Sequence, residues 1–365
     1  MRWVIVAGGT GGHLIPGIAL AEELMQSGEE VLFISGKRPI ERKILENRPF
    51  PVKELEVEGI VGRPLKDKTR ALFKLVKATF SAYNLLKKYA PSAVLAEGGY
   101  VSVPVVLSAK LLGIKSALHE QNLLPGRANR LLARLVDRVF ISFPESAVFF
   151  PANKTIFSGN PVRKELFLSR KREHEGPGLL ILGGSLGARF LNDLVLKIID
   201  RLFSESPSLF LIHQTGLEEY EKVKSQYEKW PLWERHKERI KIFPFIEDMG
   251  WAYQQADLVI ARAGASTLSE LIALKKPAIL IPFPYAADKH QDKNAEVLAK
   301  AGVALVFKQE EISPEIFLER VLDLLRNNSL LQQMSSAYEG FNIAKPERII
   351  IDEMKKILQE GRRHA

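Results

Sequence analysis

The chain opens with Arg2-Trp3-Val4-Ile5-Val6-Ala7, continues with Gly8-Gly9-Thr10-Gly11-Gly12-His13, and these residues already indicate the fold class. The first run is apolar, as is typical of a buried parallel strand. Apolar residues then recur at helical spacing over residues 15–25, and Gly28 is a typical helix stop. A second apolar run over residues 31–35 predicts the next strand. A strand, a glycine turn, a helix and another strand form a βαβ unit, so we expect a parallel sheet in an α/β fold.

The same pattern returns almost half a chain length later. An apolar run over residues 178–182 leads into Gly183-Gly184-Ser185-Leu186-Gly187, and a helical pattern follows over residues 191–199. Between the two halves, residues 163–178 are rich in charge and lack apolar periodicity, which predicts a linker. We therefore expect two doubly wound domains, residues 1–163 and 164–345. A C-terminal helix over residues 346–365 is expected to pack back towards the first domain.

The composition excludes several classes of protein. The chain has 365 residues, of which 46% are hydrophobic, and contains no Cys, which excludes disulfides, a thiolate nucleophile and Cys-ligated metal centres. No apolar run reaches the roughly 18–20 residues of a membrane span. The first residues do not resemble a signal peptide, so we expect a soluble cytosolic protein that can still touch a membrane.

Positive charge is concentrated in one segment. The net charge is +9, and residues 60–88 alone carry eight basic residues against one acidic residue. A nucleic-acid-binding protein usually spreads its basic residues along a groove, interleaved with stacking aromatic rings. The concentrated segment does not fit that pattern, so we expect no nucleic-acid partner.

The first glycine cluster does not match a nucleotide-binding fingerprint. A G-x-G-x-x-G pattern would need Gly or Ala at Leu14, and no acidic residue follows the second strand at residues 35–38. Gly12-His13 also differs from the Gly-Lys of a nucleoside-triphosphate loop. Two interpretations stay open: the backbone N–H groups face an anionic group, or the glycines only allow close packing of strand and helix.

A third helix start also supports two interpretations. Thr267-x-x-Glu270 matches a capping box, which needs no ligand. The run Gly264-Ala265-Ser266-Thr267 equally offers N–H groups for a diphosphate, with Glu270 one turn in to accept ribose hydroxyls. Taken alone, the pattern favours capping.

His13 differs from the other histidines because it begins a predicted helix. The positive end of the helix dipole disfavours imidazolium, so a neutral ring there can accept a proton. We expect His174, His236 and His364 at the surface and His213 in a strand. No Asp-x-Asp motif occurs, which argues against a carboxylate-held metal site for a diphosphate.

Eight motifs follow one another in the sequence. They are Gly8-Gly9-Thr10-Gly11-Gly12-His13, Glu97-Gly98-Gly99-Tyr100-Val101-Ser102, His119-Glu120-Gln121-Asn122, Gly159-Asn160-Pro161-Val162-Arg163, Gly183-Gly184-Ser185-x-Gly187-Ala188, Phe245-Ile246-x-x-Met249, Arg262-Ala263-Gly264-Ala265-Ser266-Thr267-x-x-Glu270 and Asp288-x-His290-Gln291-x-x-Asn294-Ala295. In this order and spacing they resemble the MurG family, bacterial UDP-N-acetylglucosamine:N-acetylmuramyl-(pentapeptide)-pyrophosphoryl-undecaprenol N-acetylglucosaminyltransferases. Two positions depart from the family pattern: Leu186, where the family usually has Gln, and Val103, where it commonly has Gly.

The resemblance implies a GT-B architecture, in which two Rossmann-like domains face a central cleft. It implies an inverting transfer of N-acetylglucosamine from UDP-N-acetylglucosamine to lipid I, giving lipid II in peptidoglycan synthesis. It also implies a peripheral protein at the cytoplasmic face of the bacterial inner membrane, with cell-wall and division machinery left open as partners. No tightly bound cofactor is implied, and a divalent cation is left open as an aid.

The resemblance further implies residue roles. Ile246 would hold the uracil through its backbone, Glu270 the ribose hydroxyls, and Gln291 the sugar, so the capping interpretation of Glu270 gives way to binding. The implied donor set is Thr10, Gly11, Gly12, Asn122, Arg163, Ser185, Ile246, Ala265, Ser266, Thr267, Leu268, Ser269, Glu270 and Gln291. On the acceptor side we expect Tyr100, His119 and Glu120.

For the chemistry we expect His13 to take the proton of the muramyl 4-hydroxyl, with Glu97 or His119 next in line. The helix start at Ser266 and Thr267 would offset charge on the departing diphosphate. For the membrane we expect a patch of basic and apolar residues, made of Lys66, Lys68, Arg70, Leu72, Phe73, Lys74, Val76, Lys77 and Phe80. The alternative for this patch is an ordinary surface helix.

The same motifs argue against three other functions. A transferase acting on another lipid, such as a diacylglycerol glycosyltransferase, is disfavoured by the His-Glu-Gln-Asn and His-Gln elements. A non-catalytic protein that binds nucleotide sugars is disfavoured by the presence of both His13 and Glu270. A phosphate-binding oxidoreductase is disfavoured by the fingerprint mismatch.

Overall fold

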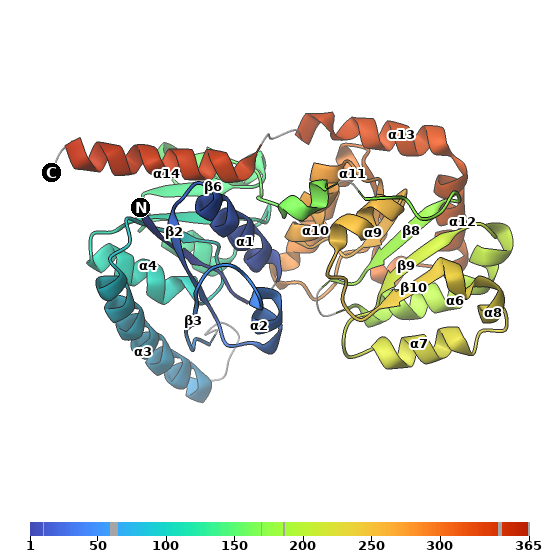
Figure 1. Cartoon of the computed structure of the whole chain (residues 1–365), viewed down its shortest axis with the longest axis horizontal. Coiled ribbons are helices and arrows are strands. Elements are labelled where there is room, and N and C mark those ends of the chain that lie inside the picture. Colours follow the sequence, from blue (N-terminus) through green and yellow to red (C-terminus); the bar gives the residue numbers. More distant parts are fainter. Residues whose placement is uncertain (10, 59–64, 169, 185–186, 342–344, 364–365) are drawn as a thin grey trace. The chain divides into compact units, whose positions relative to one another are not determined.

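The computed structural model describes residues 1–9, 11–58, 65–168, 170–184, 187–341 and 345–363, without the side chains of residues 65–68, 70, 287 and 361–363. The chain forms two compact units (Figure 1). Unit 1 comprises Met1–Arg163 and Ile343–Ala365, and unit 2 comprises Lys164–Asn342. Each unit is a parallel sheet covered by helices.

The sheet of unit 1 has seven parallel strands in the order β3-β2-β1-β4-β5-β6-β7. The strands are β1 (Arg2–Val6), β2 (Glu30–Ser35), β3 (Val52–Glu54), β4 (Ala93–Ala96), β5 (Lys115–Glu120), β6 (Arg138–Ile141) and β7 (Thr155–Phe157). The helices are α1 (Gly11–Gln26), α2 (Pro39–Leu45), α3 (Leu65–Tyr89), α4 (Ser102–Leu111), α5 (Arg127–Leu132) and α14 (Pro346–Arg363), with short 3₁₀ turns η1 (Pro144–Phe149) and η2 (Ala152–Lys154). The predicted βαβ start is confirmed.

Alternate strand residues face opposite layers of unit 1, because side chains alternate along a strand. Val4 and Val6 pack with Ala82 of α3 and with Val105 and Ala109 of α4. The opposite layer carries α1 and α14, which contact each other, and Figure 1 shows α14 lying along that side.

The C-terminal helix is held to unit 1 by ion pairs as well as by its apolar face. Arg348 of α14 lies 3.2 Å from the carboxylate of Glu23, and Lys355 lies 2.9 Å from Glu29. Ile350 and Met354 are fully buried. Residues from the far end of the sequence thus complete the fold of the first unit.

The sheet of unit 2 has six parallel strands in the order β10-β9-β8-β11-β12-β13. The strands are β8 (Gly178–Leu182), β9 (Phe210–Gln214), β10 (Ile240–Phe243), β11 (Leu258–Ala261), β12 (Ala278–Leu280) and β13 (Ala304–Val306). The helices are α6 (Arg189–Glu205), α7 (Tyr220–Glu228), α8 (Trp233–His236), α9 (Met249–Gln255), α10 (Ala265–Leu274), α11 (His290–Lys300), α12 (Pro314–Arg326) and α13 (Asn328–Ser336). Short 3₁₀ turns are η3 (Lys164–Phe167), η4 (Lys237–Arg239), η5 (Ala287–Lys289), η6 (Gln309–Glu311) and η7 (Ala337–Phe341).

A buried polar chain lies inside the apolar core of unit 2. Nε2 of His213 lies 3.0 Å from Oδ1 of Asn192, and Nδ1 lies 3.0 Å from the hydroxyl of Tyr227. The amide oxygen only accepts, so Nε2–H donates to it and Nδ1 accepts from the hydroxyl. Burial lowers the pKa of His213 to about 3, so the ring is neutral at pH 7.

Two local expectations are wrong. Residues 163–178 were predicted as a linker, but residues 170–178 pack on unit 2: the guanidinium of Arg172 pairs with Asp257, and the ring of His174 stacks on Phe210 with centroids 4.3 Å apart. His236 is not at the surface either, since its ring is buried against Trp230. In the part of the chain described here, no helix combines the length and apolar character needed to cross a membrane.

Candidate functional site

In each unit the chain first adds strands towards one edge of the sheet and then, from one point on, towards the other edge. In unit 1 the chain leaves β1 and β4, which are neighbours, towards opposite sides; in unit 2 it does so from β8 and β11. Ligands of open α/β sheets bind at such switch points, beyond the carboxyl ends of the strands. The glycine clusters after β1 and β8 therefore lie where a ligand site is expected.

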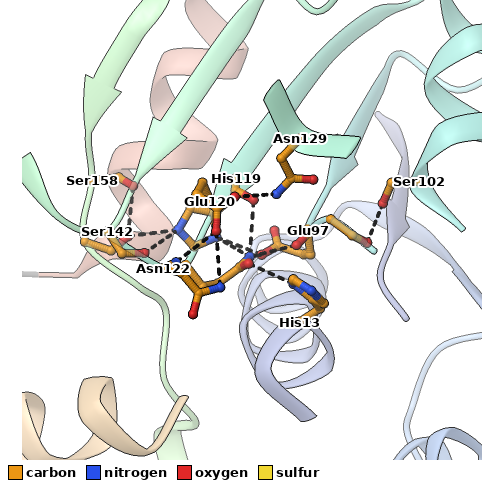
Figure 2. A network of polar contacts seen from close by, with 12 residues as sticks. His13, Glu97, Ser102, His119, Glu120, Asn122, Asn129, Ser142 and Ser158 are labelled. Carbon is orange, nitrogen blue, oxygen red and sulfur yellow. Dashed lines mark hydrogen bonds and ion pairs between the residues drawn. The ribbon is translucent and has the colours of Figure 1, made fainter. Parts of the chain in front are cut away.

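The switch point of unit 1 holds a connected set of polar side chains from the start of α1, the loop after β4 and the carboxyl end of β5 (Figure 2). His13, in the first turn of α1, has its Nδ1 atom 2.8 Å from Oε1 of Gln121. The amide nitrogen of Gln121 lies 2.9 Å from Oε2 of Glu97, and Nδ1 of His119 lies 2.7 Å from the same oxygen. His13 is half-buried, whereas Glu97, His119 and Gln121 are buried.

Two glycines after β4 leave room for the ring of His13. Gly98 and Gly99 have φ values of +98° and +78°, which other residues rarely adopt. A Cβ on Gly98 would lie 3.1 Å from Cε1 of His13, and one on Gly99 would lie 2.3 Å from the carbonyl oxygen of Gly8. The close approach of the two loops depends on the absence of side chains.

Glu120 shapes the loop that carries Asn122. Its buried carboxylate accepts from the backbone N–H of Asn122 over 2.9 Å and from Nδ2 of Asn129 over 2.8 Å. The backbone N–H of Gly126 also donates to it, over 3.3 Å. Of the three acceptor-side residues, only Tyr100 is exposed, since His119 and Glu120 are enclosed by protein.

The first glycine loop is held by residues that the sequence patterns did not single out. The backbone N–H of Gly9 donates to Oε1 of the buried Glu41 over 2.7 Å, and Arg38 donates to the carbonyl of Gly9 over 2.8 Å. Of the predicted donor residues in this loop, Gly11 and Gly12 are half-buried at the start of α1. Thr10 lies outside the described residues.

In unit 2 the helix start after β11 differs from the capping-box expectation. The N-cap of α10 is Gly264, and no side chain caps it, so Thr267 lies inside the helix. The first helical N–H groups therefore belong to Ala265, Ser266 and Thr267. Such groups have no partner inside the helix and favour an anion.

The other α10 candidates face different ways. The carboxylate of Glu270 is buried and accepts from the hydroxyl of Tyr253 over 3.0 Å. Leu268 is fully buried in the core, and the Ser269 hydroxyl donates to the carbonyl of Ala265 over 2.8 Å. The side chain of Leu268 thus packs in the core, and that of Ser269 bonds to the backbone of its own helix.

A residue missed by the sequence patterns joins two of the donor loops. The amide nitrogen of the buried Gln214 donates to the carbonyl of Gly184 over 2.8 Å, and its oxygen accepts from the N–H of Ile246 over 3.2 Å. Ile246 was expected to bind uracil through its backbone, but its N–H group already donates to Gln214 within the chain. Ser185 and the departure at Leu186 lie outside the described residues.

The remaining donor candidates are spread along the chain. Gln291 of α11 accepts from the backbone N–H of Phe283 over 2.9 Å. Arg163 is the half-buried last residue of the N-terminal segment of unit 1. Arg262, which was not predicted as a site residue, is buried and donates to the carbonyls of Ile281 and Pro282; burial lowers its pKa to about 10.

The predicted membrane patch lies on α3, and its apolar members point to solvent. Phe73 is 72% exposed and Phe80 68%, with Leu72 and Val76 above one half. Lys77 is exposed too, but Lys74 forms ion pairs with Glu56 and Glu58, so its charge is largely compensated within the chain. The side chains of Lys66, Lys68 and Arg70 lie outside the described part.

Among the residues that the structure describes, no three His, Asp or Glu side chains are grouped so that they could hold a metal ion.

Comparisons with known proteins assign both units. Residues 3–141 match the glycosyltransferase family 28 N-terminal domain and residues 178–352 match the glycosyltransferase family 28 C-terminal domain. Two relatives bear the name UDP-N-acetylglucosamine--N-acetylmuramyl-(pentapeptide) pyrophosphoryl-undecaprenol N-acetylglucosamine transferase. The one from Myxococcus xanthus is 41% identical, over 92% of this chain and 87% of its own, and the one from Desulfotalea psychrophila is 42% identical, over 91% and 90%.

A solved structure agrees with these relatives. The crystal structure of Acinetobacter baumannii MurG superposes with a TM-score of 0.74 at 33% identity, covering 97% of this chain and 99% of that one. The fold class is thereby confirmed as GT-B, with two Rossmann-like domains. The chain belongs to the MurG family of N-acetylglucosamine transferases, within glycosyltransferase family 28.

Proposed function

We propose that the chain transfers N-acetylglucosamine from UDP-N-acetylglucosamine to the muramyl 4-hydroxyl of lipid I, with His13 as general base. The environment of His13 is the observation that supports this role best. Its ring lies at the switch point of unit 1, held through Nδ1 by Gln121 and only half-buried. The other two candidates for the base, Glu97 and His119, are buried and bonded to each other.

The proposed step is a single displacement. The muramyl oxygen attacks the anomeric carbon as its proton passes to Nε2 of His13, and the bond from that carbon to the diphosphate oxygen breaks. The electron pair leaves with UDP, and the configuration inverts. The first N–H groups of α10, from Ala265 to Thr267, are suited to offset the charge that develops on the diphosphate.

Donor recognition is proposed for unit 2. In this proposal Glu270 accepts the ribose hydroxyls while Tyr253 fixes its carboxylate, and Gln291 contacts the sugar. We expect turnover without a tightly bound metal, which an assay in the presence of EDTA checks; loss of activity in EDTA would show a metal requirement.

The acceptor is a lipid, so we further propose that α3 meets the cytoplasmic face of the bacterial plasma membrane. Four exposed apolar side chains, of Leu72, Phe73, Val76 and Phe80, would enter the interface, and basic residues of the same helix would meet anionic headgroups. Sedimentation with anionic liposomes tests this, with charge reversal at Lys66, Lys68, Arg70, Lys74 and Lys77 as the comparison. Equal binding of both forms would refute the patch.

The function itself is tested by transfer of radiolabel from UDP-N-acetylglucosamine to a lipid I analogue, with UDP-glucose as the comparison donor. We expect label in a lipid II analogue from the first donor and much less from the second. A chain that binds UDP-N-acetylglucosamine but transfers nothing would be a binding protein instead.

A further inference from the structure

Gln121 joins the half-buried His13 to a buried carboxylate–imidazole pair. It follows β5 directly, its side chain is fully buried, and its two amide atoms have different neighbours. Oε1 lies 2.8 Å from Nδ1 of His13, whereas Nε2 faces the other way, towards Glu97.

The surroundings of Nε2 fix which way the amide points. This atom lies 2.9 Å from the carbonyl oxygen of Glu97, 2.9 Å from its Oε2 and 3.3 Å from the carbonyl oxygen of His119. Its fourth neighbour, Nδ1 of His119 at 3.2 Å, already donates to Oε2 of Glu97 over the shorter distance of 2.7 Å. Carbonyl and carboxylate oxygens only accept hydrogen bonds. The flipped amide would direct its oxygen at three oxygens in a buried site, where an unpaired polar atom costs about 1–3 kcal/mol. The NH₂ group therefore faces Glu97, and the oxygen faces His13.

This orientation selects one tautomer of His13. An amide oxygen can only accept, so Nδ1 of His13 must carry a proton, and in the neutral ring the lone pair is then on Nε2. When Nε2 takes up a further proton, the bond from Nδ1–H to Gln121 stays in place. The amide thus suits both protonation states of a base that works through Nε2.

The anchor of the amide is itself fixed. Oε2 of Glu97 also accepts from Nδ1 of His119, and Nε2 of His119 lies 3.1 Å from both the hydroxyl of Ser142 and the carbonyl oxygen of Gly159. Figure 2 shows His13, Glu97, His119 and Ser142 in one connected network. Residues at the carboxyl ends of β4, β5, β6 and β7 therefore converge on the orientation of a single amide.

We propose that Gln121 is a positioning residue, which Glu97 and His119 orient so that it holds His13 as the Nδ1–H tautomer with Nε2 as the proton acceptor. This inference rests on the proposed function, in which His13 is the base. In this inference Glu97 and His119 orient the amide of Gln121, and the amide orients His13 for the reaction.

The test has a spectroscopic and a kinetic arm, both on the full chain. Nitrogen-15 shifts of the imidazole rings report the tautomer of His13, assigned by the signal missing from His13→Gln. We expect the Nδ1–H form in the parent chain and its loss in Gln121→Met, which has a similar volume but no amide. We expect kcat of Gln121→Met to fall about 10- to 100-fold, with KM for the donor changed less than threefold.

The matched control is Ser108→Ala, which removes a buried hydroxyl of α4 bonded to the carbonyls of Pro104 and Thr79. It loses hydrogen bonds in the same unit, so it should lower stability while tautomer and kcat stay as in the parent. In a His13→Ala background, adding Gln121→Met should slow turnover no further, because its effect passes through His13.

Two results would overturn the proposal: an unchanged His13 tautomer in Gln121→Met, or a changed tautomer with parent kcat. If His13→Ala alone keeps full turnover, the proposed base is wrong, while the nitrogen-15 arm still decides whether Gln121 sets the tautomer. If Gln121→Met does not fold, Gln121→Asn retains a buried amide but withdraws its oxygen from His13 by one methylene, and the same two readouts apply.

Discussion

The backbone N–H of Ile246 donates to Oε1 of Gln214 over 3.2 Å. Through its other amide atom Gln214 also holds Gly184, so one buried side chain links the loop after β8 to the segment after β10. Both segments belong to the proposed donor site, and their separation depends on this amide.

Replacing Gln214 by Met should therefore weaken donor binding. Loss of the two hydrogen bonds is expected to cost about 1.4 kcal/mol, which is a tenfold rise in the Kd for UDP, measured by calorimetry. Gln255→Met is the matched control, because Gln255 is also a buried amide of unit 2, bonded to the N–H of Glu173 and the carbonyl of Lys171. Equal affinities of the two variants would contradict the linking role.

Substitutions at Gly99 and Gly113 separate two costs of adding a side chain. One is the strain of a positive φ in a non-glycine residue, and the other is the clash between two loops that approach closely. Both have positive φ, but a Cβ on Gly113 has nothing within 4 Å, whereas one on Gly99 meets the carbonyl of Gly8 at 2.3 Å. Gly113→Ala should cost about 1 kcal/mol of unfolding free energy and keep kcat. Gly99→Ala should cost about 1–3 kcal/mol more and lower kcat, because it displaces the loop before His13. Similar urea midpoints and rates for both variants would show that the loops have room to move apart.

His213 predicts acid sensitivity of unit 2. Its pKa is about 3 in the folded chain because of burial, against an ordinary value of 6.5. Between these values the unfolded chain binds a proton that the folded chain does not, so the free energy of unfolding decreases as the pH falls. The slope from this residue is about 1.4 kcal/mol per pH unit, starting below pH 6.5.

The comparison variant is His213→Gln, whose amide can still donate to Asn192 and accept from Tyr227. Urea unfolding at several pH values between 7 and 4, followed by tryptophan fluorescence, should give a shallower pH dependence for this variant than for the parent. An identical pH dependence would mean that His213 is protonated in the folded protein too.

Lys74 and Lys77 lie on the same helix but should contribute differently to membrane binding. Lys74 is paired with Glu56 and Glu58, whereas the side chain of Lys77 is exposed. Removing Lys77 should weaken binding to anionic vesicles about fivefold, from about 1 kcal/mol per basic residue, and removing Lys74 should change it less than twofold.

The apolar part of the patch has its own control. Phe73→Ser should reduce vesicle binding, while Val148→Ser should not, although Val148 in η1 is 82% exposed. Equal losses would show that general surface apolarity, not the patch on α3, governs the association.

Much of the fold was predictable because its signals are local. The apolar runs at residues 3–7 and 178–182, each followed by glycines, predicted both sheets and the site-bearing turns. The capping box at Thr267 failed because Gly264, in an extended conformation, begins the helix three residues earlier. The prediction of a linker over residues 163–178 was wrong because charged residues there, such as Arg172, form ion pairs with residues far along the chain, in this case Asp257.

The candidate site was predictable only in part. His13 stands out in the sequence through its glycine-rich context, but Gln121 lies 108 residues away and no local pattern ties the two together. Glu41, Gln214 and the ion pairs of Lys74 were missed for the same reason. Which polar side chains hold a loop depends on strand order, and residue spacing alone does not give it.

Single-turnover transfer by His13→Ala decides whether His13 is the base for transfer from UDP-N-acetylglucosamine to lipid I. With donor saturating and a radiolabelled sugar, we expect a rate about 10²–10⁴-fold below that of the parent chain, with the Kd for UDP-N-acetylglucosamine unchanged. A His13→Ala chain that forms labelled product at the parent rate would contradict it.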